Sequence, residues 1–169
     1  ALQYFEKALE IEPNRAEVHD NLGVTLKELG RSEEAEASNS QAVKLKPDFA
    51  EAHNNLGVTL HELGRFDEAE ASYIKAIVLK PDYAEAHSNL GSAIQHLIRL
   101  DKAEESFKHA LVLKPDYAVA HSNLGVILLK KGRHREGLHN KLIGDGIINF
   151  DLKAGFDVVT VDLKVGLSV

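Results

Sequence analysis

The chain has 169 residues, of which 44% are hydrophobic and 27% charged, and its formal net charge is −6. This acidic balance argues against nucleic acid as a partner, because phosphate contacts need clustered Lys and Arg. Without cysteine the chain has neither a disulfide framework nor a thiolate metal site. No apolar run approaches the roughly 20 residues that span a bilayer, so we expect no membrane span. The compartment stays open, with the cytoplasm slightly favoured.

A period of 34 residues organises most of the chain. A proline, a Leu-Gly pair and two small residues each recur with this spacing. The prolines are Pro13, Pro47, Pro81 and Pro115; the Leu-Gly pairs lie at 22–23, 56–57, 90–91 and 124–125; the small residues are Ala35, Ala69 and Ala103, then Ala42, Ala76 and Ala110. A period of this length is typical of stacked helical repeats.

In chain order, the pattern predicts an unpaired helix and then a series of helix pairs. The expected bounds are 1–11, then 15–29 with 32–45, 49–63 with 66–79, 83–97 with 100–113, and a single helix over 117–131. The chain thus opens inside a helical pattern, and we expect its natural N-terminus to lie upstream. Each proline ends a helix because it lacks an N–H and clashes with the preceding turn.

Helix ends carry their own signals. Asn14, Asp48 and Asp82 follow the prolines as expected N-caps, while Gly30 and Gly64 are expected to close helices in the left-handed conformation. Other glycines, at 23 and 57, lie inside predicted helices, where glycine costs about 1 kcal/mol relative to alanine. A repeated cost implies a packing reason, and we expect these glycines to let paired helices approach Ala35 or Ala69 closely.

The repeat is expected to fail from about Arg133. Gly137, Gly144 and Gly146 oppose a helix there, and alternating apolar residues over 148–152 and 159–163 then predict a β-hairpin. The expected organisation is an all-α solenoid with a short hairpin-like tail. The solenoid spans 1–132, as half repeat 1–15, full repeats 16–49, 50–83 and 84–117, and partial repeat 118–132; the tail spans 133–169.

These features resemble the tetratricopeptide repeat family over roughly residues 1–132. The resemblance implies a right-handed α-solenoid whose first helices line a concave groove. Three features depart from the family pattern. Histidines replace the frequent Trp at His19, His53, His87 and His121, Asn39 replaces an aromatic residue, and Ile98 replaces the turn glycine.

An asparagine row precedes the Leu-Gly pairs: Asn21, Asn55, Asn89 and Asn123. An amide both donates and accepts hydrogen bonds, so the row can hold a peptide backbone irrespective of its sequence. Helices pack 8–10 Å apart, so successive asparagines would match about three residues of extended chain. The row is similar to the groove asparagines of O-GlcNAc transferase repeat domains, which hold substrate peptide backbones. The alternative is an asparagine that only packs between first helices.

Neighbouring groove positions are acidic or polar: Asp20, Asn54, Glu51 and Glu85. They favour a ligand with some positive charge, or else form an ordinary solvated face. The groove lacks the Lys and Arg with which some tetratricopeptide domains clamp a carboxylate terminus.

The register-matched histidines would lie about 10 Å apart and could not share a metal ion. We therefore expect packing roles for them, no metal, no cofactor and no catalytic site.

Three functions follow as hypotheses. The first is a non-catalytic scaffold that binds an extended protein or peptide segment. The second is an interaction module of a larger, transferase-type enzyme. The third is a self-assembling subunit, because an unpaired second helix at 1–11 and an unpaired first helix at 117–131 could complete each other head to tail, giving a homo-oligomer or filament.

Overall fold

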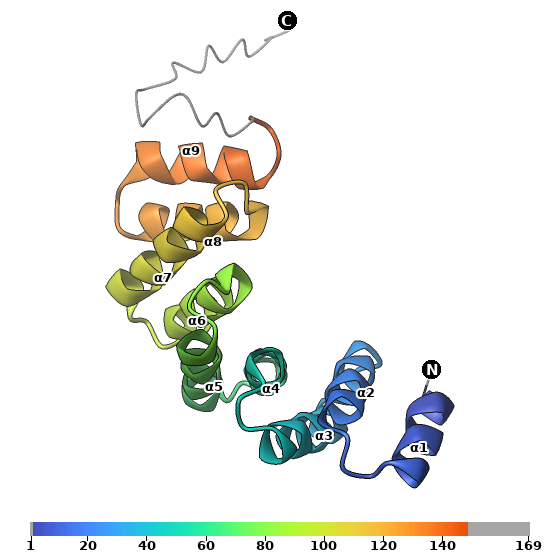
Figure 1. Cartoon of the computed structure of the whole chain (residues 1–169). Coiled ribbons are helices and arrows are strands. Elements are labelled where there is room, and N and C mark those ends of the chain that lie inside the picture. The colour runs from blue at the N-terminus through green and yellow to red at the C-terminus, as the bar shows by residue number, and fades with distance from the viewer. Residues whose placement is uncertain (1, 149–169) are drawn as a thin grey trace, which may run out of the picture.

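The computed structural model describes residues 2–148, and within them the chain is entirely helical (Figure 1). The helices are α1 (Leu2–Ile11), α2 (Ala16–Glu28), α3 (Ser32–Leu45), α4 (Ala50–Glu62), α5 (Phe66–Leu79), α6 (Ala84–His96), α7 (Leu100–Leu113), α8 (Ala118–Lys130) and α9 (His134–Gly144). The predicted solenoid is confirmed. The predicted hairpin falls almost wholly on residues after 148, outside the part of the chain that the structure describes.

The helices stack as pairs. α2 packs most closely on α3, α4 on α5, α6 on α7 and α8 on α9. Each second helix then packs on the next first helix, and the first helices α2, α4, α6 and α8 also contact one another directly. The stack curves, and α2, α4 and α6 lie on the inner side of the bend (Figure 1).

The helix starts differ from the prediction by one residue. α2, α4 and α6 begin at Ala16, Ala50 and Ala84, and their capping positions are Arg15, Phe49 and Tyr83, none with a side-chain cap hydrogen bond. The predicted N-caps Asn14, Asp48 and Asp82 are therefore wrong, because they lie one residue too early, in the turn after proline. Glutamates in the first turn bind backbone N–H groups at these helix starts. Glu17 and Glu51 each accept a hydrogen bond from their own N–H group, which helps to lower the pKa of both carboxyl groups.

The helix ends agree with the prediction. Gly30, Gly64 and Gly132 have φ values of 73°, 74° and 75°. The N–H of Gly30 donates to the Lys27 carbonyl at 2.8 Å and that of Arg31 to the Leu26 carbonyl at 2.9 Å, which closes α2. Ile98 occupies the same position after α6 with a φ of 62°, the only positive φ of a non-glycine residue among residues 2–148.

The glycines inside helices mark close contacts. A Cβ on Gly57 would lie 2.6 Å from the Tyr73 ring, and one on Gly91 would lie 2.8 Å from the Phe107 ring. The predicted close approach is thus confirmed, but at Gly57 the facing group is an aromatic ring rather than Ala69. The buried Asn39 takes the ring's place against Gly23.

The last pair of helices corrects the sequence prediction. α9 is a helix although Gly137 and Gly144 lie in it. A Cβ on Gly137 would lie 2.8 Å from Cγ of Leu129, and one on Gly144 would lie 2.4 Å from the Ser122 nitrogen. The close approach of α9 to α8 leaves no room for a Cβ at residues 137 and 144. Glycine is therefore required at both positions, and α9 forms with these glycines in it. α8 consequently has a partner, which removes the unpaired first helix on which head-to-tail assembly depended.

Two series of ion pairs recur along the stack, one between neighbouring repeats and one within a repeat. In the first, an arginine before a second helix binds a glutamate in the preceding repeat, as Arg65 does with Glu36 at 2.7 Å and Arg133 with Glu104 at 2.6 Å. The same arginine also binds a glutamate three residues later, Glu68 or Glu136. In the second series, a lysine at the end of a second helix binds a glutamate of the same repeat's first helix; these pairs are Lys46–Glu17, Lys80–Glu51 and Lys114–Glu85.

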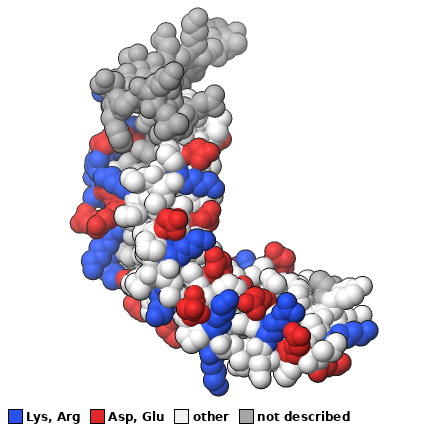
Figure 2. Space-filling view, in the orientation of Figure 1, with Lys and Arg blue, Asp and Glu red and all other residues white. Residues whose placement is uncertain are grey.

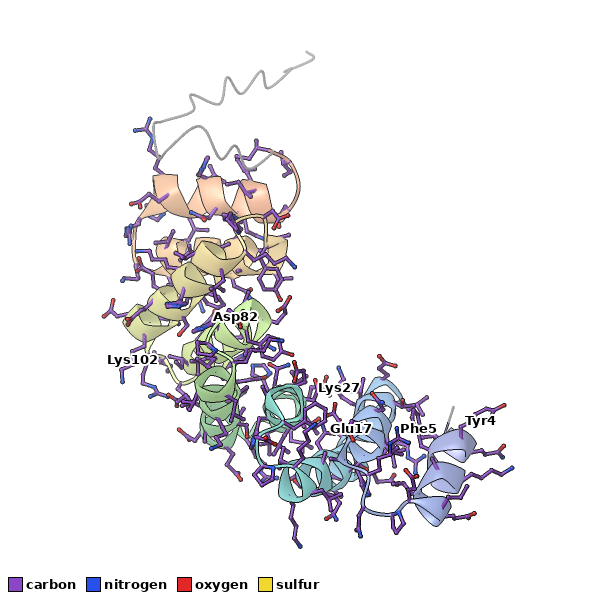
Figure 3. The ribbon with its side chains drawn as sticks, viewed as in Figure 1. Tyr4, Phe5, Glu17, Lys27, Asp82 and Lys102 are labelled. Carbon is purple, nitrogen blue, oxygen red and sulfur yellow. The ribbon has the colours of Figure 1, made fainter. Side chains whose placement is uncertain are left out.

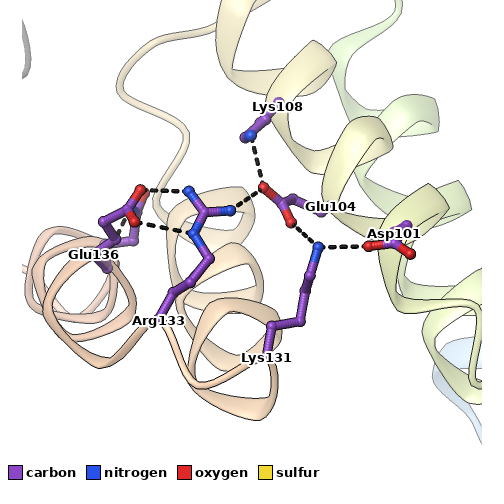
Figure 4. Close-up of polar contacts among 7 residues, drawn as sticks. Asp101, Glu104, Lys108, Lys131, Arg133 and Glu136 are labelled. Atoms are coloured by element: carbon purple, nitrogen blue, oxygen red, sulfur yellow. Dashed lines mark hydrogen bonds and ion pairs between the residues drawn. The ribbon is translucent and has the colours of Figure 1, made fainter.

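Glu104 is the centre of the densest ion-pair network among residues 2–148 (Figure 4). Glu104 is 5% exposed, and its carboxylate receives hydrogen bonds or ion pairs at 2.6 Å from Lys108, Lys131 and Arg133. Burial acts to raise the pKa of Glu104, but the three cations outweigh it and lower the pKa to about 2. The network fastens α7 to the α8–α9 pair.

Candidate functional site: the inner groove

The asparagine row lies on the helices that form the inner side of the bend. Asn21, Asn55, Asn89 and Asn123 belong to α2, α4, α6 and α8 in turn. Nδ2 of Asn55 donates to both carboxylate oxygens of Asp20, at 3.0 and 3.1 Å. The amide of Asn89 donates to Oδ1 of Asn54 at 3.0 Å. These bonds join each first helix to the preceding one.

The packing interpretation of the asparagines is therefore partly true, and it leaves capacity for a ligand. Asn123 also donates backwards, to Oγ of Ser92 at 3.3 Å. An amide has two N–H groups and an accepting oxygen. Within residues 2–148 no group donates to the amide oxygens of Asn55, Asn89 and Asn123, and all three side chains are half-buried. Asn21, the first of the row, is exposed.

The glutamates along the edge of the groove are neutralised. Lys46 lies 3.1 Å from Glu17 and Lys80 lies 2.9 Å from Glu51. Each lysine also lies over an aromatic ring, with Nζ 4.8 Å from the ring centre of Phe49 or Tyr83. Figure 3 places Glu17 and Lys27 on the side of α2 that faces α4. Glu51 and Glu85, predicted as groove acids, thus carry structural ion pairs.

A second row runs beside the asparagines: Asp20, Asn54, Ser88 and Ser122. Its first three members are buried, with exposures of 6%, 6% and 1%. Burial raises the pKa of Asp20, against the hydrogen bond from Asn55, and the charges of Glu51 and Glu17 raise it further. The hydroxyl of Tyr83 shares this region: burial, Glu51, Glu85 and Asp20 raise its pKa to about 12.

The last position of this row has a different partner. Nζ of Lys141, from α9, donates to Oγ of Ser122 at 2.9 Å and binds Asp145 at 2.8 Å. Lys141 was not among the predicted site residues, because the repeat was expected to end at residue 132. The available signal was its position, 34 residues after Phe107, between glycines that continue the small-residue register.

The register-matched histidines have structural roles. Nε2 of His19, His53, His87 and His121 lies 2.9, 3.0, 3.1 and 2.8 Å from the carbonyl oxygen of the proline six residues earlier. An N–H donated there ties each first helix to the end of the preceding second helix. Among residues 2–148 no three His, Asp or Glu side chains converge on a possible metal position.

One aromatic cluster was not predicted. His61 packs edge-on against Phe66 and His96, each with ring centres 5.1 Å apart, and Phe66 stacks on His96 at 4.3 Å. Burial lowers the pKa of His61, and the neighbouring His96 lowers it further. The cluster joins α4, α5 and α6.

Acidic and basic side chains alternate over the visible face, and neither sign forms a continuous area (Figure 2). No helix among the described residues is long and apolar enough to cross a membrane.

Solved structures share this architecture. The crystal structure of MamA superposes with a TM-score of 0.77 at 26% identity, over 86% of this chain and 85% of that one. The pilF protein of Pseudomonas aeruginosa gives a TM-score of 0.77 at 24% identity, over 84% of this chain and 65% of that one. The first TPR of Spaghetti (RPAP3), solved with the HSP90 peptide SRMEEVD, gives 0.68 at 24% identity, over 69% and 93% of the two chains.

The family models match the sequence itself. A model for the TPR repeat matches residues 25–64 and 59–97, and a model for the tetratricopeptide repeat matches residues 4–37. No curated protein matches the chain. The repeat period, the helix pairs and these matches agree, and the chain belongs to the tetratricopeptide repeat family.

Proposed function

We propose that this chain is a protein-interaction scaffold that holds an extended segment of a partner protein along its inner groove. The observation that carries the proposal is the asparagine row. Asn55, Asn89 and Asn123 are already positioned by bonds to the preceding helix, and their amide oxygens have no donor within residues 2–148. A fixed amide loses little conformational freedom when it binds, which favours affinity.

The chemistry of the row suits a main chain. Amide groups pair with the N–H and C=O groups of any peptide, so the binding would tolerate many sequences. The RPAP3 domain shows that this fold can hold a short peptide in another protein. That peptide, SRMEEVD, contains two Glu and an Asp. The groove of this chain has buried Asp20 at its N-terminal end, and we expect it to select differently.

The test uses a displayed library of twelve-residue peptides selected against the full chain. Variants Asn89→Ala and Asn123→Ala are combined, because their partners Asn54 and Ser92 are uncharged, so that the loss leaves no buried charge without a partner. If each amide contributes about 1 kcal/mol, the double variant should bind the selected peptides roughly thirtyfold more weakly. Asn14→Ala, at an exposed turn residue, is the matched control. Unchanged binding by a folded double variant would remove the asparagine row from the mechanism.

A further inference from the structure

Asp20 is the one charged member of the second groove row within residues 2–148. Its counterparts, 34, 68 and 102 residues further on, are Asn54, Ser88 and Ser122. Asp20 is buried, with 6% of its surface exposed. Its hydrogen bonds in the structure come from a single group, the Nδ2 amide of Asn55.

The fold does not need this charge. In the next repeat Asn54 has the same position and accepts the same bond, from Asn89 at 3.0 Å, with a neutral amide oxygen. The repeat therefore contains its own control: a neutral side chain supports the same contact between first helices. Burying an ionised carboxylate without a cation costs stability, so the charge at Asp20 does not stabilise the fold.

No cation within the described residues neutralises Asp20. The nearby lysines are committed elsewhere, Lys46 to Glu17 and Lys80 to Glu51. The charged groups that act on Asp20 are Glu51 and Glu17, both negative, and together with burial they raise its pKa. Asp20 is consequently an anionic side chain without a cationic partner among the described residues, at the N-terminal end of the groove.

We infer that Asp20 binds the side chain of a Lys or Arg in the partner segment, so that the groove accepts an extended segment with a basic residue at this end. The inference rests on the proposed function and specifies its ligand. A cation placed at Asp20 would pair with a carboxylate held away from bulk water, where an ion pair is strongest. The backbone of the same segment would continue along Asn55 and Asn89.

The experiment measures a charge preference and its dependence on Asp20. The probes are fluorescein-labelled twelve-residue peptides of alternating Ser and Thr, each with a single Lys whose position is moved along the peptide, and matched peptides with norleucine in place of Lys. Affinities are measured by fluorescence anisotropy with the full chain, at low and high salt. We expect the wild type to bind the best Lys peptide about tenfold more tightly than its norleucine match.

Asp20→Asn reproduces the Asn54–Asn89 contact and should keep the fold. It should reduce the tenfold ratio to about one while leaving the affinity for the norleucine peptide unchanged. Asn54→Asp is the converse variant, which adds a carboxylate one repeat later and should favour a second Lys about three residues from the first. It also keeps the idea testable if Asp20→Asn is unstable.

The outcomes separate the two proposals. Peptide binding with a Lys preference that Asp20→Asn leaves intact would overturn this inference and leave the scaffold standing. Binding without any Lys preference would do the same. If neither these peptides nor a selected library binds the wild type, the scaffold proposal and the inference fall together.

Discussion

Replacement of Glu104 by Gln should destabilise the chain by a measurable and pH-dependent amount. The carboxylate accepts from Lys108, Lys131 and Arg133, and these cations lower its pKa from 4.5 to about 2. A difference of this size corresponds to about 3 kcal/mol at most, since one pH unit equals ~1.36 kcal/mol. The three cations stay partly in water, so we expect about 1–2 kcal/mol.

The sign of the pH dependence follows from the direction of the shift. The folded pKa lies below the unfolded one, so the stabilisation is complete above about pH 4.5 and is lost as the pH falls towards about 2. Glu104→Gln cannot titrate at this position. The difference in unfolding free energy between wild type and variant should therefore be largest at pH 7 and should have fallen by more than half at pH 3.

Urea denaturation followed by circular dichroism at pH 7, 5 and 3 measures this difference. Glu105→Gln is the control, because Glu105 is exposed and belongs to none of the ion pairs among residues 2–148. Equal losses for the two variants, or a loss for Glu104→Gln that does not change with pH, would refute the reasoning. Lys131 and Arg133 keep Asp101 and Glu136 as partners, so the variant should not unfold.

Two backbone predictions can be tested on the same apparatus. Ile98→Gly should stabilise the chain by about 1 kcal/mol, because Ile98 is 82% exposed and has a φ of 62° that glycine adopts without strain; the converse Gly64→Ile should destabilise it by a similar amount, and opposite signs would contradict the strain argument. Gly144→Ala should cost at least about 2 kcal/mol despite the better helix propensity of alanine, because its Cβ would lie 2.4 Å from the Ser122 nitrogen. A thermal melt that shows Gly144→Ala to be more stable than wild type would disprove the close contact.

The fold was predictable because the same residue types recur at the same positions of several repeats. Pro47, Gly57 and Gly64 each had a counterpart one period away, so a single ambiguous residue could not mislead. The prediction failed where propensity was considered without packing. Gly137 and Gly144 were taken as helix breakers, yet both occupy the positions of Ala103 and Ala110, where the register demands a small residue.

The candidate site was less predictable because its meaning depends on pairing between helices. The sequence placed Glu51, Glu85 and Asp20 together as acids of one groove. Only coordinates show that Glu51 and Glu85 have lysine partners while Asp20 has an amide alone. The lysines lie 29 residues downstream, on another helix, and nothing local in the sequence links them to these acids. Lys141 was missed for a different reason, because its segment was expected to lie outside the repeat.

The arginines between repeats give the solenoid a mechanical property. Arg65 and Arg133 each bind two glutamates, one in their own repeat and one in the preceding repeat, on partly exposed surface. Such pairs weaken when salt screens them, with a Debye length of about 10 Å at 0.1 M. The stack of repeats should therefore become less stiff as the ionic strength rises. A bound segment that spans several repeats would then contact a groove whose curvature varies more at high salt, even if the segment itself carries no charge.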